Sequence, residues 1–335
     1  MSKETMTWLE NNTLIGYTDK RGNAWHHRAG STNHFPGAIP VETVRDRLFK
    51  WDAVPSPVYV ESADGEGFEP IPNRTAWVRS DTRAVLGVFS EGYQGHGYNE
   101  WLINNVASIV DTSAGDLAIG SAGLLKGGAV AWVQIETADT VKTEQGFDFR
   151  PFLLATTSFD GTVATQYGNK VQATVCDNTL EAALGEKGQV YKLKHTKNSG
   201  MKIADAREAL KIIFDSADDF SAQVKALTET SVSDAQWAQF LDAHVPVPEA
   251  TGRGKTVAEN KRDALGATWL HDDRVSPWKG TALGVLQAVN TYNTHEATVR
   301  NAVRQDRMMQ NVISGKLGES DREAMGQLNK ILINA

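Results

Sequence analysis

The sequence has one cysteine in 335 residues, which excludes an internal disulfide framework and is typical of a reducing compartment. It has no run of eighteen or more apolar residues, so we expect no membrane span. The first thirteen residues are polar and mixed in charge, and they lack the basic-then-apolar order of a secretion signal. Together these absences predict a cytoplasmic protein without a membrane partner.

Motifs of high catalytic specificity are also missing. Residues 115–128 are rich in glycine but contain neither a phosphate-loop nor a dinucleotide pattern. The segment Gly252–Thr256 contains Gly-Lys-Thr, yet the earlier glycine of a phosphate loop is absent, and its Arg253 and Lys255 are candidates for phosphate contact only. Ser158 is not in a Gly-x-Ser-x-Gly elbow. We therefore predict no catalytic residue, no metal and no cofactor, and favour a protein that is not an enzyme.

The hydrophobic content of 41% is enough for a sizeable core. Short apolar runs joined by turns dominate up to about residue 190, whereas apolar residues at helical spacing dominate afterwards. This pattern predicts an α+β fold: an antiparallel sheet with interspersed helices, followed by a mostly helical C-terminal region. The expected parts are an N-terminal arm over 1–40, a sheet domain over 41–190 and a helical region over 191–335.

Residues 147–184 predict the centre of the sheet. An apolar strand over 149–158 is followed by Asp160-Gly161, a pair that tight hairpin turns favour, and by a second strand over 170–175. Asp177 and Asn178 offer N-cap oxygens for a helix starting there. The turn explains Ser158 and Asp160 better than a nucleophile does, and Cys176 is expected to be a small buried residue.

The clearest basic feature of this acidic chain, whose net charge is −7, is a run without any acidic residue between its ends. Lysines beside an aromatic residue can neutralise phosphates and stack a base, which is what single-stranded DNA binding requires. An ordinary solvated loop is the alternative. The candidate DNA-binding residues of this run are Lys187, Tyr191, Lys192, Lys194, Lys197 and Lys202.

A second basic candidate lies near the C-terminus. Arg300, Arg304 and Arg307 are spaced so that a continuous helix would place them on one face. They are a further candidate DNA-binding surface, and pairing with nearby carboxylates or with a neighbouring subunit is the alternative.

Histidines cluster near Trp25. His26 and His27 are adjacent and His34 follows, but adjacent residues of an extended chain point to opposite faces and no further ligand completes a site. We expect Trp25 to anchor packing and the histidines to be hydrogen-bonded.

Several motifs, in the same order along the chain, resemble a phage and plasmid family, the domain of unknown function 932. They are Trp25-His26-His27, Leu86-Gly87-Val88 with Gly92-Tyr93, Thr157–Gly161, Val175–Leu180, Lys194–Asn198, Trp269, Thr281–His295 and Arg304–Gly315. This chain has Phe159 where Ser-His-Asp is common in the family, which argues against an obligatory catalytic histidine there. The resemblance implies a phage or mobile-element context, the cytoplasm of the infected host and a role in DNA metabolism, but no specific activity.

The order of the expected elements is also similar to that of single-strand annealing proteins of the recombination-mediator type, which implies an oligomer that binds single-stranded DNA. Our leading hypothesis is therefore a homo-oligomeric phage protein that binds and anneals single-stranded DNA. The alternative is an acidic interaction protein that inhibits or redirects a host protein without binding DNA. A metal-assisted hydrolase using the N-terminal histidines is a third hypothesis.

Overall fold

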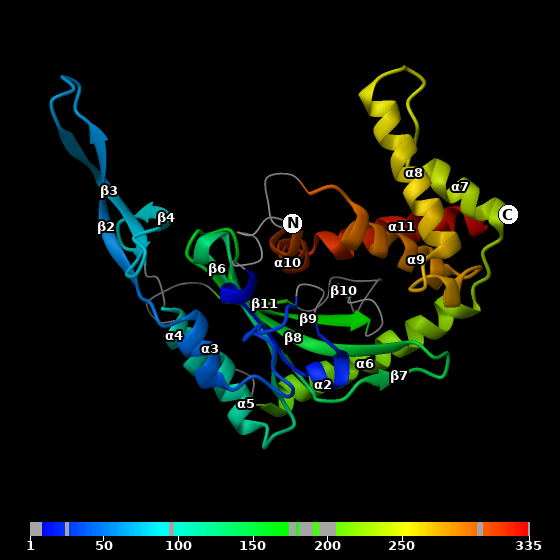
Figure 1. The fold of residues 1–335 in the computed structure, drawn as a ribbon, viewed down its shortest axis with the longest axis horizontal. Helices are drawn as coiled ribbons and strands as arrows, with labels where there is room; N and C mark the ends of the chain where they lie inside the picture. The colour runs from blue at the N-terminus through cyan, green and yellow to red at the C-terminus, as the bar shows by residue number, and fades with distance from the viewer. Residues whose placement is uncertain are drawn as a thin grey trace. The chain divides into compact units, whose positions relative to one another are not determined.

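A computed structural model describes residues 9–23, 27–93, 97–173, 179–180, 190–193, 206–299 and 304–333 (Figure 1). Two compact units divide the chain. The first comprises residues 1–138, 152–168 and 189–212, and the second comprises residues 139–151, 169–188 and 213–335. The units alternate along the sequence, so strands β8 (Asp148–Ser158) and β9 (Thr165–Ala173) each contribute to both. The boundaries at residues 40 and 190 stay a prediction.

The predicted α+β class is confirmed: antiparallel sheets with interspersed helices precede a helical C-terminal region. A three-stranded sheet has the order β2–β3–β4, and an eight-stranded sheet has the order β1–β5–β6–β8–β9–β10, with β7 on β8 and β11 on β9. The other strands are β1 (Thr13–Ile15), β2 (Ala53–Glu61), β3 (Phe68–Arg79), β4 (Val85–Ser90), β5 (Ala118–Leu125), β6 (Val130–Glu136), β7 (Val141–Lys142), β10 (Thr179–Leu180) and β11 (Val190–Leu193).

The glycine content of residues 115–128 predicts a connection, but strand β5 occupies most of this stretch. Its glycines are needed because large side chains of β6 lie across it. A Cβ on Gly120 would overlap the Glu136 carboxylate, and one on Gly123 would meet the Trp132 ring at 2.7 Å. Glycine usually weakens a strand, but here it makes room for its neighbours, so tertiary packing overrides local propensity.

The Gly, Asn and Pro content of the N-terminal arm predicts a loop, but the structure contains regular elements there. β1 pairs antiparallel with β5, and the short helix α2 (Thr18–Arg21) follows it. Leu14 is fully buried in β1, so the arm adds a strand to the sheet instead of lying over it as a loop. Burial of this apolar side chain is the physical reason for the ordering.

Strand β8 and the turn after it agree with the sequence, since β8 is buried along nearly its whole length and pairs with β6. The helix predicted after Asp177 is wrong at Thr179 and Leu180. These two residues form β10 and pair with Gln172 and Val171 of β9. Pairing with an existing strand satisfies their backbone groups, which outweighs the capping signal. Cys176, Asp177 and Asn178 themselves lie outside the described residues.

Helix packing on β5 involves one helix of the first unit. Helix α3 (Val41–Leu48) contacts β5 and the π-helical segment η1 (Leu102–Ala107), which is flanked by α4 (Tyr98–Trp101) and α5 (Ser108–Thr112). The chain turns from β5 to β6 through the 3₁₀ segment η2 (Lys126–Gly128).

The helical region has its own core, in which the indole rings of Trp237 and Trp269 stack at 4.5 Å. The sequence Ser233-Asp234-Ala235-Gln236 predicts a capping box, and the structure confirms it: the Ser233 hydroxyl accepts from the Gln236 amide at the start of α7. The helices are α6 (Ala206–Glu229), α7 (Asp234–His244), α8 (Arg253–His271), the 3₁₀ turn η3 (Ser276–Trp278), α9 (Ala282–Thr291), the π segment η4 (Tyr292–Glu296), α10 (Arg304–Ser314) and α11 (Lys316–Ile333).

No helix within the described ranges is both long and apolar enough to cross a membrane.

One ion pair is buried in the first unit. The Arg21 guanidinium of α2 lies 2.6 Å from Glu136 Oε1 of β6, and the Glu136 side chain is completely buried. Gln134 donates to the other Glu136 oxygen at 3.2 Å and accepts from Ser121 at 2.8 Å. Burial raises the pKa of Glu136, and the charge and hydrogen bond of Arg21 oppose this rise. Arg21 thus supplies the opposite charge beside a carboxylate that is buried in the sheet.

We expect Arg21→Ala to lower the free energy of unfolding by about 3–5 kcal/mol, because it leaves Glu136 buried without its cation. The double variant Arg21→Ala/Glu136→Gln should recover part of this loss, since its buried side chain is neutral. Urea denaturation followed by circular dichroism measures both. Equal losses in the single and double variants would contradict this account of the pair.

Candidate binding surfaces

The basic run is only partly within the described residues. Tyr191 and Lys192 belong to β11, where they are paired with Tyr167 and Gln166 of β9. Lys187, Lys194, Lys197 and Lys202 lie outside the described residues. The structure therefore places Tyr191 and Lys192 of the run on a strand of the eight-stranded sheet.

The arginine stripe is only partly within the described residues. Apolar spacing in the sequence predicts a helix over residues 281–300, but in the structure this helical stretch ends with η4 at Glu296, and Ala297 has an extended ψ of 135°. Arg304 is the first residue of α10, and Arg307 is exposed on the same helix. Arg300 lies outside the described residues, so a common face for all three stays a prediction.

Two of the histidines near the N-terminus, His27 and His34, pack against each other. The rings of His27 and His34 meet edge to face at 4.7 Å, and His34 Nδ1 lies 3.0 Å from Asn33 Oδ1. Burial first, and His27 second, lower the pKa of His34. Trp25 and His26 lie outside the described residues, within which no group of three His, Cys, Asp or Glu could hold a metal. Two imidazoles alone are too few for the four ligands of zinc.

The Ser158–Val163 segment is a turn, as predicted. The Ser158 hydroxyl donates to the Val163 carbonyl at 2.7 Å, and Asp160 accepts from the Thr162 amide at 2.9 Å. Lys126 also pairs with Asp160 at 2.8 Å. The hydrogen bonds of Lys126 and Thr162 outweigh burial and lower the pKa of Asp160. These contacts use the side chains for structure.

A further exposed apolar surface of the first unit lies on a β ribbon formed by β2 and β3 (Figure 1). The sequence predicts only two short strands, over residues 58–60 and 75–79, around an acidic, glycine-rich loop. In the structure β2 and β3 are paired from Ala53–Arg79 at the root to Glu61–Phe68 near the tip, with one irregularity between Pro57 and Tyr59. Strand β4 extends only along the lower half, opposite Arg74 to Val78.

The distal half of the ribbon, residues 59–74, exposes large apolar side chains. The exposed fraction is 55% for Tyr59, 75% for Phe68, 52% for Val60 and 37% for Ile71. Successive side chains of a strand alternate between faces. The register therefore puts Tyr59 and Phe68 on one face and Val60 and Ile71 on the other.

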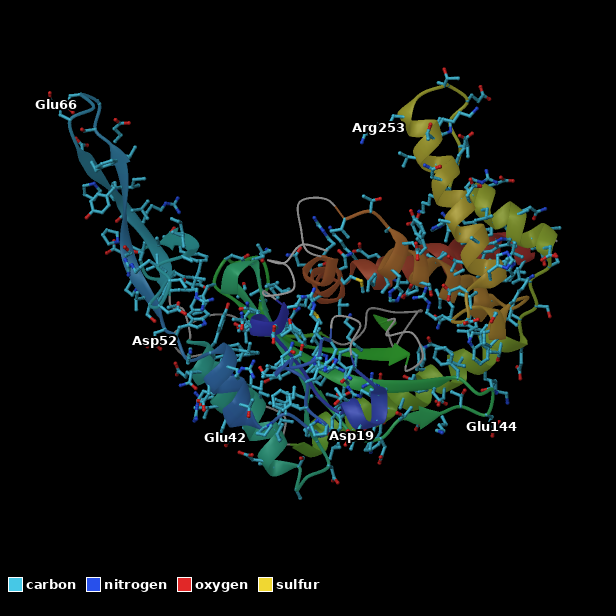
Figure 2. The ribbon with its side chains drawn as sticks, viewed as in Figure 1. Asp19, Glu42, Asp52, Glu66, Glu144 and Arg253 are labelled. Atoms are coloured by element: carbon cyan, nitrogen blue, oxygen red, sulfur yellow. The ribbon has the colours of Figure 1, made fainter. Side chains whose placement is uncertain are left out.

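The tip of the ribbon is acidic, and Figure 2 shows Glu66 at its end and Asp52 near its root. The Ser62 hydroxyl and the Glu66 amide donate to Asp64 Oδ1 at 2.7 and 3.0 Å. These two hydrogen bonds, the backbone one first, lower the pKa of Asp64. Glu61 and Glu69 bring the number of carboxylates in residues 61–69 to four, and no basic residue lies between Glu61 and Arg74.

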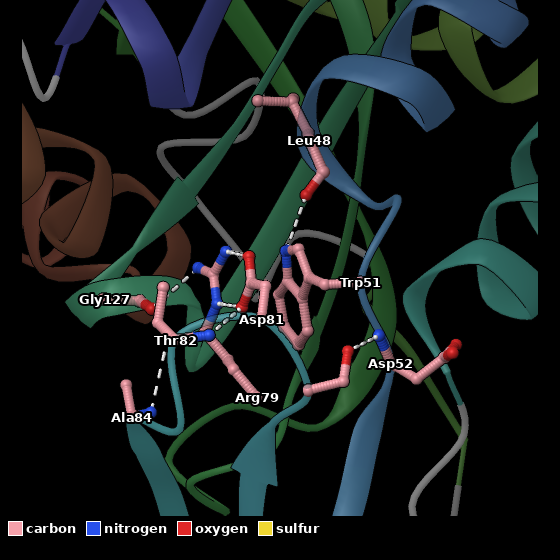
Figure 3. A network of polar contacts seen from close by, with 9 residues as sticks. Leu48, Trp51, Asp52, Arg79, Asp81, Thr82, Ala84 and Gly127 are labelled. Atoms are coloured by element: carbon pink, nitrogen blue, oxygen red, sulfur yellow. Dashed lines mark hydrogen bonds and ion pairs between the residues drawn. The ribbon is translucent and has the colours of Figure 1, made fainter.

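A cluster around Arg79 holds the root of the ribbon (Figure 3). The guanidinium donates two hydrogen bonds to Asp81, at 2.9 and 2.8 Å, and one to the Gly127 carbonyl at 3.1 Å. It also lies 4.2 Å above the Trp51 ring. A Cβ on Gly128, whose φ is +104°, would come within 2.7 Å of the guanidinium. The β5–β6 turn thus closes around a residue of the ribbon.

Aromatic rings also connect the root of the ribbon to the segment that follows β8. Trp77 of β3 stacks at 6.0 Å on Phe159. Phe159 is buried and also meets Tyr98 at 4.8 Å. Ring packing at the ribbon root therefore explains an apolar residue at position 159.

A sequence signal for the ribbon existed in the spacing of prolines. Pro55 and Pro57 lie in β2, and Pro70 and Pro72 lie in β3. Proline in a sheet is confined to edges and bulges, so two pairs at a spacing of two predict open strand edges. From the sequence alone, Pro55 and Pro57 indicate only that the preceding helix does not continue.

We expect Arg79→Lys to weaken the ribbon root by about 1–3 kcal/mol, because lysine cannot make the two-pronged contact with Asp81. Hydrogen exchange should become faster at residues 53–79. Arg74→Lys is the matched control, since Arg74 is exposed on the same strand and makes a single long contact of 3.4 Å with Ser90. Equal exchange in both variants would refute the role of Arg79.

The Asp81 contact also predicts an acid dependence. The hydrogen bond from Arg79 is the first cause that lowers the pKa of Asp81, from 3.8 to about 2. Because the native pKa is the lower one, the pair stabilises the native state above about pH 4 and loses this contribution as the pH falls toward 2. Thermal unfolding between pH 5 and 2.5 should therefore show a weaker acid dependence in Asp81→Asn than in the wild type. Identical curves would contradict the assignment.

No curated protein and no solved structure matches the chain. One family model does, over residues 85–313, which is more than half of the chain. The match begins at the first residue of β4 and leaves β2 and β3 outside it. The motifs from Leu86 to His295 that suggested this family lie within the match. The chain therefore belongs to the family described as domain of unknown function (DUF932).

Proposed function

We propose that this protein is a non-enzymatic phage protein that binds single-stranded DNA in the host cytoplasm and anneals strands as a homo-oligomer. The observation that carries the proposal is the basic run, which has five lysines and no acidic residue between Lys187 and Lys202. Strand β11 attaches Tyr191 and Lys192 of this run to the eight-stranded sheet. Lysines beside an aromatic residue on a sheet scaffold can neutralise phosphates and stack a base.

The element order gives additional support. β4 ends at Ser90, helices α4 to α5 follow, and the antiparallel strands β5, β6, β8 and β9 come next. This is the order that is similar to single-strand annealing proteins. The last expected element differs at Thr179 and Leu180, which form β10 where a helix was expected. Similarity of element order supports a binding role but does not establish one.

The charge of the described surface favours a second candidate. The chain has a net charge of −7, and the ribbon tip gathers four carboxylates. Such a surface repels phosphate and fits an interaction protein that inhibits or redirects a host protein. Under this candidate the protein would not bind an oligonucleotide even at low salt.

The triple variant Lys192→Glu/Lys194→Glu/Lys197→Glu tests the basic run. We expect at least a tenfold loss of affinity for a fluorescent oligothymidine at about 50 mM salt, measured by anisotropy. Each phosphate contact on a single strand contributes about 0.7 to the slope of log K against log salt, so the slope should fall by about 2.

The matched control is Lys225→Glu/Lys316→Glu/Lys330→Glu, in which three exposed helical lysines change by the same total charge. It should lose far less affinity than the first variant. Equal losses would show that net charge, and not the basic run, governs binding. A wild type that does not bind at low salt would refute the DNA proposal and favour the second candidate.

A further inference from the structure

The distal half of the β2–β3 ribbon leaves large apolar side chains exposed on both of its faces. A two-stranded ribbon is marginally stable in water unless one of its faces packs against something. Here Tyr59 and Phe68 are exposed on one face and Val60 and Ile71 on the other. Taking about 200 Å² for each aromatic side chain, the two rings alone expose roughly 250 Å². Exposed apolar patches of a few hundred Å² mark interaction sites.

The edges of the ribbon exclude one mode of binding. Within the described residues, β2 pairs only with β3, and β4 does not reach the distal part of β3, so both distal edges are open. Pro70 and Pro72 remove amide donors from β3, as Pro55 and Pro57 do from the lower part of β2. Prolines on edge strands oppose the addition of further strands, so the distal edge of β3 is a poor site for strand addition. Contact through the side-chain faces is the mode that would cover the exposed apolar side chains of the ribbon.

The charge of the tip restricts the partner further. The carboxylates of Glu61, Asp64, Glu66 and Glu69 would repel those of another tip, so two ribbons do not pair end to end. The ribbon instead fits an apolar surface with basic residues nearby. The same chain supplies opposite charge, because residues 187–202 have five lysines and no acidic residue.

We propose that the distal β2–β3 ribbon is a self-association element that packs, through both faces, on the body of a second copy of this chain. A second copy is present whenever the chain folds, so it can cover a ribbon that is marginal alone. Because the ribbon of one copy contacts a different surface of the next, the contact is heterologous, which builds rings or open chains. The Arg79 cluster holds the root of the ribbon to its own subunit during this contact.

This inference does not depend on DNA binding, although it would supply the oligomer that annealing requires. It is tested on the full-length protein without DNA, by sedimentation velocity over a range of concentrations. We expect species larger than the 36.5 kDa monomer in the wild type. Tyr59→Ser/Phe68→Ser should raise the dissociation constant about tenfold or more, as for the loss of buried aromatic contacts at an interface.

The matched control is Val85→Ser/Val88→Ser, which removes two exposed apolar side chains of β4, 65% and 49% exposed, at the lower part of the same sheet. This variant should assemble like the wild type. A wild type that stays monomeric at every concentration overturns the proposal and leaves the ribbon to a different protein. So does a ribbon variant that assembles normally, or a control that is equally impaired.

A second measurement locates the contact directly. A photoreactive group attached at Glu69→Cys, in a Cys176→Ala background, should yield a cross-linked dimer, whereas the same group at Val85→Cys should not. Equal cross-linking from both positions would overturn the proposal. Oligothymidine binding measured on the same ribbon variants separates the two proposals, because failure of self-association leaves DNA binding by single copies unchanged.

Discussion

The contact between Arg79 and the β5–β6 turn is the constraint on which the surface of the first unit depends. Its guanidinium reaches Asp81, the Gly127 carbonyl and the Trp51 ring at once, and therefore joins the end of β3 to the turn of the larger sheet. Without this connection the ribbon would be attached through its chain ends and the ring contacts of Trp77. With it, the exposed residues of the distal half are held out from a fixed root.

Two kinds of surface emerge on this scaffold, and they differ in charge. The basic run, which includes Tyr191 and Lys192 of β11, suits phosphate, whereas the ribbon tip is acidic and its faces are apolar. A single partner does not match both, because groups that attract phosphate and groups that repel it serve different ligands. The proposed nucleic-acid surface and the proposed association element would each use one of these two features.

The family match separates these features as well. It starts at β4 and includes the central sheet, β11 and most of the helical region, but it stops short of the ribbon. The residues that carry the family pattern, such as Ser158 and Asp160, are used in turns and ion pairs. The family match thus covers most of the scaffold, and β2 and β3 of the ribbon lie outside it.

The sequence by itself determined the α+β class, the β8 hairpin turn and the helices of the C-terminal region, including the Ser233 capping box. These depend on local patterns: apolar periodicity, Asp-Gly turn chemistry and side-chain caps. Only the tertiary structure decided that Gly120 and Gly123 belong to a strand, because their role is to admit side chains of β6. The same holds for β10, for the Arg21–Glu136 pair and for the length of the ribbon. Each of these results from a partner distant in sequence, and local propensity has no information about that partner.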